Sequence, residues 1–317
     1  MEHTPVLVDA IVELLGPPLS GGGIVVDATL GRAGHALRLL TISPEIELIG
    51  IDRDLEALEA SRTVLSAHQE RVRLVRDDFQ NVSSVLERLG VAEVCGVLFD
   101  LGVSSPQLDD RARGFSFRSD GPLDMRMDTG QSLSASGVVN HYSAGELERV
   151  IGRYGEERFA RRIARAIVRA RPIRSTVALA EIVKSAIPAA TRRTGGHPAR
   201  RTFQGIRIEV NRELDALEIA LPDAIEALST GGRAVVVSYH SLEDRIVKQT
   251  FKEQSGDCTC PPDFPQCRCG AHARVRVLTK RPTRPTQLEI DRNPRSGAAK
   301  LRALERLAPV PGERRAP

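Results

Sequence analysis

Residues 25–35 decide the fold of this chain, and they read Val25-Val26-Asp27-Ala28-Thr29-Leu30-Gly31-Arg32-Ala33-Gly34-His35. An apolar strand runs here into a tight turn with glycines at positions 31 and 34, and a helical pattern follows. Glycine lets backbone N–H groups approach a ligand closely, and the start of a helix favours negative charge. The stretch therefore predicts a site for a nucleotide-like cofactor, with an ordinary strand-to-helix turn of an α/β protein as the alternative.

A second apolar run, residues 47–51, ends at Asp52, which follows Gly31 by 21 positions. An acidic side chain about 20 residues after the glycine turn is spaced to reach a ribose hydroxyl. The turn lacks the G-x-G-x-x-G spacing of dinucleotide-binding proteins, and Asp27 adds a carboxylate that suits a cation better than a pyrophosphate. We therefore expect S-adenosylmethionine, whose methionine end is cationic, in preference to a dinucleotide.

Up to Pro106 the chain alternates short Val, Ile and Leu runs with helical patterns, which is typical of a doubly wound, mainly parallel sheet. The runs are apolar almost throughout, as expected when helices cover both faces. Ligands then belong at the carboxyl ends of the strands. A long helix is expected over residues 203–228, followed by a Gly231-Gly232 turn. Strands are expected at residues 24–29, 47–52, 72–76, 94–100 and 233–238, with antiparallel edge strands at 273–279 and 299–305.

The strand rhythm stops after Pro106 and returns only beyond residue 203. Helical patterns around residues 144–171 and 176–190 indicate an inserted, all-helical domain. The cofactor-binding domain is therefore expected to be discontinuous. The predicted parts are residues 1–105 and 203–307 for that domain, 106–202 for the inserted substrate-recognition domain and 308–317 for a disordered tail.

Arginines crowd the insert, although the net charge of the chain is only +4. A second arginine cluster extends from Arg192 to Arg201. Two clusters in one insert favour a surface that contacts phosphates, with a solvated helix face as the alternative. The first cluster is a stripe of Arg158, Arg162, Arg165 and Arg169, beside an apolar stripe of Phe159, Ile163, Ile167 and Ala170 that is expected to pack inward.

Four of the five cysteines lie close together, at Cys258, Cys260, Cys267 and Cys269. Four thiolates can bind a structural zinc ion, but the C-x-C spacing departs from the usual C-x2–4-C, and plain reduced thiols are the alternative. No apolar run approaches the ~20 residues of a membrane helix, and no signal peptide is evident. We expect a cytoplasmic protein without a membrane partner.

Longer blocks make the chain recognisable: residues 27–35, 99–110, 114–117, 121–127, 197–204, 207–211 and 238–245. These blocks resemble the bacterial ribosomal RNA small subunit methyltransferase H family, and the resemblance extends from Thr4 to Arg295. Ala28 and Ala33 stand where this family often has glycine, and Gly205 where it often has alanine; the amide of Ala33 is expected to face the ligand.

The resemblance implies a class I, Rossmann-like, S-adenosylmethionine-dependent methyltransferase that modifies N4 of a cytidine in the decoding region of 16S ribosomal RNA. Its partner would be 16S ribosomal RNA or the small ribosomal subunit, and the enzyme would act as a monomer or homodimer. The residues themselves support Asp52, Phe79 and Asp100 independently, whereas Gln107 rests on the resemblance alone, and His35 equally suits a packing or capping role. The implied cofactor contacts are Ala33, Gly34, His35, Asp52, Phe79, Asp100 and Gln107.

Cytosine N4 is a weak nucleophile because its lone pair is delocalised into the ring. The Asp100 carboxylate and the hydroxyls of Ser104 and Ser105 are candidates to hold the N4 protons and turn the lone pair toward the methyl group, while an Asp100 that only holds the cofactor is the alternative. The RNA-contact candidates are Arg201, Arg207, Tyr239 and His240, against surface salt bridges for the arginines and a structural turn for the other two.

Two other functions compete. A DNA amino-methyltransferase would share the fold and an N4 target, but residues 100–103 lack the Asn/Asp/Ser-Pro-Pro-aromatic block typical of those enzymes. A non-catalytic RNA-binding assembly factor would keep the fold without turnover, and the presence of Asp52 and Asp100 favours retained cofactor binding.

Overall fold

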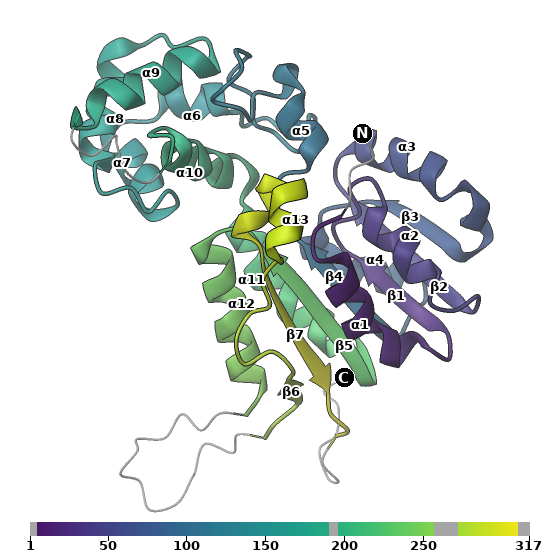
Figure 1. Cartoon of the computed structure of the whole chain (residues 1–317). Helices are drawn as coiled ribbons and strands as arrows, with labels where there is room; N and C mark the ends of the chain where they lie inside the picture. Colours follow the sequence, from purple (N-terminus) through teal and green to yellow (C-terminus); the bar gives the residue numbers. More distant parts are fainter. Residues whose placement is uncertain (1–4, 190–195, 257–271, 310–317) are drawn as a thin grey trace, which may run out of the picture. The chain divides into compact units, whose positions relative to one another are not determined.

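The computed structural model describes residues 5–189, 196–256 and 272–309 (Figure 1). The chain forms two compact units, which we call the sheet unit (residues 1–102 and 215–317) and the helical unit (residues 103–214). The first boundary lies close to the predicted one. The second lies at residue 214 instead of 202.

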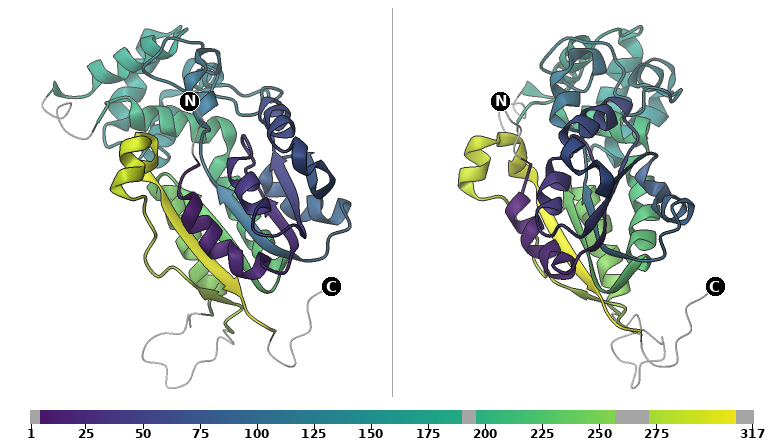
Figure 2. Two further views of the ribbon diagram at one scale, coloured as in Figure 1. Left: turned by 45° about the vertical axis from the view of Figure 1, so that its right-hand side comes forward. Right: turned by 90° about the vertical axis from the view of Figure 1, so that its right-hand side faces the viewer.

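The sheet unit holds a seven-stranded sheet in the order β3-β2-β1-β4-β5-β7-β6 (Figures 1 and 2). Strands β1 to β5 are parallel, and β7 is antiparallel to both β5 and β6. The predicted doubly wound, mainly parallel sheet with an antiparallel edge is confirmed. The strands are β1 Gly23–Asp27, β2 Ile46–Asp52, β3 Val72–Arg76, β4 Val94–Asp100, β5 Leu228–Ser238, β6 Val275–Val277 and β7 Lys300–Arg306.

Helices cover both faces of this sheet. On β1, Val25 belongs to one buried cluster and Val26 to the other, because successive side chains of a strand point to opposite faces. This double coverage explains the apolar runs. The helices are α1 Val8–Leu19, α2 Gly34–Leu40, α3 Leu55–Val64, α4 Val82–Arg88, α11 Glu213–Glu226, α12 Ser241–Gln254 and α13 Gln287–Arg292, with 3-10 helices at Ser66–Arg71, Phe79–Asn81 and Pro294–Ala298.

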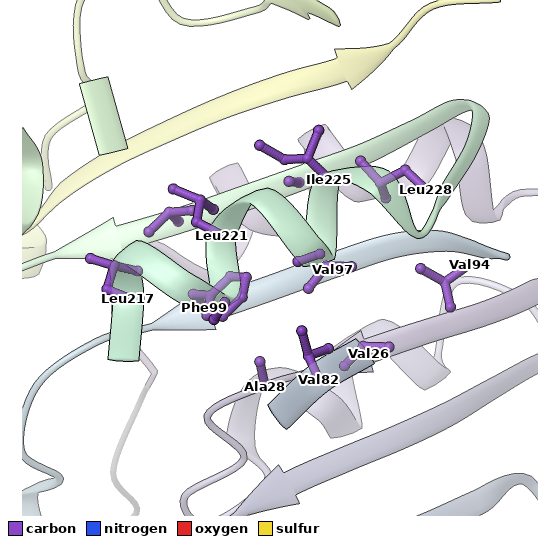
Figure 3. Close-up of a cluster of buried hydrophobic side chains, with 14 of the residues drawn as sticks. Val26, Ala28, Val82, Val94, Val97, Phe99, Leu217, Leu221, Ile225 and Leu228 are labelled. Carbon is purple, nitrogen blue, oxygen red and sulfur yellow. The ribbon is translucent and has the colours of Figure 1, made fainter. Parts of the chain in front are cut away.

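The packing of α11 on β4 fixes the strand that ends at Asp100. Leu217, Leu221 and Ile225 of α11 lie over Val97 and Phe99 of β4 (Figure 3). All five side chains are at most 1% exposed. Burial of one such side chain contributes about 1.5–3 kcal/mol, so this contact holds β4 rigidly in the middle of the sheet.

The helical unit has its own core, which includes Leu147, Ile163, Leu179 and Phe203. Among its described residues the only β-type pairing is an isolated bridge between Pro122 and Ser175, in agreement with the predicted all-helical insert. The helices are α5 Ser105–Asp109, α6 Ala135–His141, α7 Ala144–Arg153, α8 Ala160–Ala170, α9 Thr176–Ala186 and α10 Arg200–Asn211, with a 3-10 helix at Arg111–Arg113.

Two expected helices are each divided in the structure. The pattern over residues 144–171 forms α7 and α8, separated by a segment that includes Glu156 in the left-handed region (φ 49°). The helix expected over residues 203–228 ends at Asn211, where Arg212 is left-handed (φ 51°) and α11 follows. A left-handed residue cannot continue a right-handed helix. Because α10 packs into the core of the helical unit, the boundary moves to residue 214.

Other predictions need correction or lie outside the described residues. Gly231 and Gly232 are part of β5, beside a shift in its register with β4, and do not form a separate turn before the strand. Ala170 is exposed, because it lies at the end of α8, beyond the buried stripe. No helix in the described ranges has both the length and the apolar character needed to cross a bilayer. The cysteine cluster, Arg192, Arg193 and residues 310–317 lie outside the described residues.

Asn211 connects two of the sequence blocks inside the helical unit. Its Oδ1 accepts a hydrogen bond from the amide of Met127 at 2.8 Å, and its Nδ2 donates to the carbonyl of Met125 at 2.7 Å. Both bonds are buried, and Met125 is left-handed (φ 58°). The Asn211 side chain therefore holds the strained segment around residues 121–127 against the end of α10.

Replacing Asn211 with alanine should lower the free energy of unfolding by about 2–4 kcal/mol, because it leaves two buried backbone groups unpaired. Urea denaturation followed by circular dichroism measures the loss. The control is Asn81→Ala, which removes only an exposed hydrogen bond to Asp77 and should change stability by less than about 0.5 kcal/mol. Equal stabilities of the two variants would contradict this role of Asn211.

Candidate functional site

Acidic side chains gather where the parallel strands of the sheet unit end. Asp27 ends β1, Asp52 ends β2 and Asp100 ends β4. Because β1 lies between β2 and β4, these three ends are neighbours at one edge of the sheet. This edge is where doubly wound sheets bind their ligands.

Asp52 fastens the glycine turn. Its Oδ2 accepts a hydrogen bond from the amide of Gly31 and its Oδ1 accepts one from the amide of Asp54, each at 2.8 Å. Burial raises the pKa of Asp52 to about 6, against the effect of these two bonds. Each carboxylate oxygen has a further lone pair, so Asp52 can hold the turn and still accept a hydroxyl.

Ala33 shapes the turn in a way that the sequence did not predict. It is fully buried and left-handed, with φ 59°. Its amide donates to the carbonyl of Leu30 at 2.8 Å and so closes the turn. The next residue, Gly34, allows the ring of Pro5 to approach closely, because a Cβ at position 34 would lie 2.6 Å from Cγ of Pro5.

Asp100 is held by three residues, two of which contact its carboxylate. Its backbone amide donates to Oγ1 of Thr29 at 2.6 Å. The hydroxyl of Tyr239, just beyond β5, donates to Oδ1 at 2.9 Å, and Nε2 of His35 lies 3.3 Å from Oδ2. The amide of Thr29 in turn donates to Oδ1 of Asp27 at 3.2 Å. The ends of β1, β4 and β5 are thereby joined into one polar cluster.

His35 lies within a negative environment and is only 7% exposed. Burial lowers the pKa of its imidazole, but the contact with Asp100 and the charges of Asp100 and Asp27 outweigh burial and raise that pKa above its usual value. Neither ring nitrogen has a well-aligned hydrogen bond among the described residues, so the contact with Asp100 is an ion-pair contact. The pKa of His35 is thereby shifted toward the charged form of the imidazole.

Burial raises the pKa of Asp27 to about 7, although the charge of His35 opposes the rise. Burial and the adjacent charge of Asp100 also raise the pKa of the Tyr239 hydroxyl well above its usual value. Tyr239 therefore stays protonated at neutral pH and acts as a donor to Asp100.

His240 has a structural place in the sheet unit. It caps α12: its Nδ1 accepts a hydrogen bond from the amide of Glu243 at 3.3 Å, and Oε2 of Glu243 accepts from the amides of Tyr239 and His240. The structural turn weighed in the sequence is therefore present. The same turn sets the position of the Tyr239 ring.

Phe79 follows β3, as expected. Its ring packs edge-on against Phe99 of β4, with centroids 5.9 Å apart and an angle of 88° between the ring planes. Next to it, Asp78 pairs with Arg53 at 3.0 Å. Phe79 is partly buried and packs against the hydrophobic cluster that contains Phe99.

The remaining candidates belong to the helical unit. Ser104 caps α5, since its Oγ accepts from the Gln107 amide while Oε1 of Gln107 accepts from the Ser104 amide; Ser105 begins that helix. Arg207 forms a two-point ion pair with the buried Glu213, with both contacts at 2.8 Å. A salt bridge was the alternative to RNA contact for this arginine. Arg201 is exposed, with its Nη1 donating to the carbonyl of Glu156.

Sequence reasoning missed Thr29 and Glu243. Thr29 lies inside the quoted turn, and its position two residues after Asp27 was the available signal. Glu243 could not be found in this way, because no local pattern shows that its carboxylate accepts a hydrogen bond from the amide of Tyr239.

The edge of the sheet suits a cationic ligand with hydroxyl groups. Asp27 and Asp52 have raised pKa values because the positive charge around them does not offset their burial. A bound cation would supply the missing charge, and ribose hydroxyls would find carboxylate acceptors. The fold and these residues together define a class I methyltransferase whose cofactor is S-adenosylmethionine.

The chain belongs to the MraW methylase family, which it matches over residues 1–307. It is 53% identical to the "Ribosomal RNA small subunit methyltransferase H" of Frankia alni over 314 residues, covering 98% of this chain and 96% of that protein. The proteins of the same name from Thermobifida fusca and Brevibacillus brevis are 52% and 50% identical, each covering 96% of this chain and 93% and 98% of their own. The family resemblance is confirmed.

Asp27→Asn should make the stability of the protein less dependent on pH. A carboxyl group with a pKa raised from 3.8 to about 7 binds a proton in the folded state that the unfolded chain has released, so stability falls as pH rises from about 4 to 7. The variant, relative to the unmodified protein, should gain about 2–3 kcal/mol between pH 5 and pH 8. Urea denaturation at the two pH values measures this gain, and a pH-independent difference between the proteins would refute it.

Proposed function

We propose that the protein transfers a methyl group from S-adenosylmethionine to N4 of a cytidine in the decoding region of 16S ribosomal RNA. The observation that supports this most is the fixed carboxylate of Asp100 at the end of β4, with Thr29, His35 and Tyr239 around it. The names of the relatives support ribosomal RNA of the small subunit as the substrate class.

The cofactor would lie across the carboxyl ends of β1, β2 and β4. Asp52 would accept the ribose hydroxyls, Phe79 would lie beside the adenine, and the turn from Gly31 to His35 would enclose the methionine end. S-adenosylmethionine supplies a methyl group already activated on a sulfonium. Gln107 remains a proposed contact on the resemblance alone, and Ala33 would act through the shape of the turn.

Asp100 would act on the acceptor base. A hydrogen bond from an N4 proton to its carboxylate would increase the electron density on N4 and turn the nitrogen lone pair toward the methyl group. Tyr239 and His35 would keep the carboxylate correctly oriented. Ser104 and Ser105 remain candidates for the second N4 proton. No strong base is required, because N4 becomes acidic as it is methylated.

The cytidine must leave its stack before its N4 can reach such a carboxylate. The helical unit would hold the surrounding RNA. Arg201 is the better of the two arginine candidates there, because Arg207 is already engaged by Glu213. Tyr239 and His240 would act from the sheet unit mainly by shaping the site.

The test incubates the protein and methyl-labelled S-adenosylmethionine with naked 16S ribosomal RNA, assembled small subunits and cytosine-containing DNA. Nuclease digestion followed by mass spectrometry then identifies the modified nucleoside. We expect N4-methylcytidine at one position of the ribosomal RNA, in the naked or the assembled form. Label on DNA alone, or on a carbon atom of the base, would refute the proposal.

Tyr239→Phe should slow methyl transfer by about 10-fold, because Asp100 loses the donor that orients it. Affinity for S-adenosylmethionine, measured by calorimetry, should change less than about 3-fold. Tyr142→Phe is the matched control: it removes the hydroxyl that donates to Glu209 in the helical unit and should leave the rate unchanged. Equal rates for the two variants would exclude Tyr239 as a positioning residue.

A further inference from the structure

The helix α8 presents one strongly basic face. Its buried side chains are Ala160, Ile163, Ala164 and Ile167. At 3.6 residues per turn, the four arginines of α8 and Arg158, which lies two residues before the helix begins, fall on the opposite side, and all five are exposed. The α8 arginine face consists of Arg158, Arg161, Arg162, Arg165 and Arg169.

These arginines differ from three others of the helical unit. Arg126, Arg149 and Arg207 form ion pairs with Asp124, Glu209 and Glu213. In contrast, no member of the α8 arginine face forms an ion pair with any residue that the structure describes. Arg158 lies over the ring of Phe159, 4.7 Å from its centroid, which leaves its N–H groups available.

The sequence of α8 offers no acidic side chain that could neutralise the arginine face from within the helix. Residues 160–170 contain no Asp or Glu. Glu157, just before the helix, is 7% exposed, and its Oε1 accepts from the amide of Phe159. Five like charges on one side of a short helix repel one another, and α8 gains no compensation for this within the described part of the unit.

We propose that the α8 arginine face binds the phosphates of the ribosomal RNA strand that flanks the target cytidine. This inference rests on the proposed function and adds the surface that would engage the RNA. Guanidinium groups match phosphate oxygens in two-point hydrogen bonds. From Arg158 to Arg169 the face extends over 12 residues, or about 17 Å, enough to follow several successive phosphates. An apolar partner is disfavoured because the face carries no apolar side chain.

The test replaces three exposed members, Arg162→Gln, Arg165→Gln and Arg169→Gln, in one variant. Glutamine keeps the helix propensity and removes the charge. The control variant carries Arg62→Gln, Lys248→Gln and Lys280→Gln, which removes three exposed positive charges from the sheet unit. Both lose the same net charge, so a general effect of charge is separated from an effect of the face.

Binding of each protein to 16S ribosomal RNA transcribed in vitro is measured at several salt concentrations, with circular dichroism to verify folding. The α8 variant should bind at least about 10-fold more weakly near 0.15 M salt, and its plot of log affinity against log salt should be shallower by about 2–3. The control should match the unmodified protein. Affinity for S-adenosylmethionine should be unchanged in both.

Equal RNA affinity and salt dependence of the two variants would overturn the proposal. So would strong binding of the unmodified protein to phosphatidylglycerol vesicles that only the α8 variant loses, with RNA binding intact. The proposed function is tested separately by methyl transfer: if the unmodified protein binds RNA through this face but methylates none, the function fails while the surface stands. If RNA is methylated and the α8 variant binds and methylates normally, the surface fails alone.

Discussion

The rest of the site depends on the fixed position of one carboxylate at the end of β4. Oδ1 of Asp100 faces the Tyr239 hydroxyl, and its Oδ2 faces the imidazole of His35. Burial lowers the pKa of His35, but the contact with Asp100 and the charges of Asp100 and Asp27 raise it above its usual value. His35 follows Gly34 at the start of α2, so the turn that Asp52 holds also sets the position of the imidazole beside Asp100.

The strands of the sheet, the position of the site at their carboxyl ends and the buried side of α8 could be predicted from the sequence, because the signals for them are local. The apolar runs that end in Asp52 and Asp100 identified two strands and the edge where they meet. The stripe of Ile163 and Ile167 identified the buried side of α8. The contacts between distant segments could not be predicted in this way: Tyr239 follows Asp100 by 139 positions, and no periodicity reports that their side chains meet.

The predicted end of the helix over residues 203–228 failed for a different reason. A helix pattern continues through Asn211 and Arg212, yet α10 ends there, where Arg212 is left-handed and the side chain of Asn211 is bonded to the backbone around Met125. No local pattern in the sequence reports either feature. Arginine shows the same dependence on context: Arg207 is fixed by a buried glutamate, whereas Arg165 projects from a helix without acidic residues, although the sequence made both candidates for RNA contact.

The contact between Pro5 and Gly34 gives the glycine turn a second constraint, which comes from packing. The glycine at position 34 is required by the proline ring that crosses it, since a Cβ would fall 2.6 Å from Cγ of Pro5. Gly34 itself does not have a positive φ. A glycine in a cofactor turn is ordinarily explained by the ligand, but here the space beside it is taken by a residue 29 positions earlier in the chain. The residue types at these two positions are therefore coupled, because a side chain at position 34 requires the ring of Pro5 to move or to be replaced.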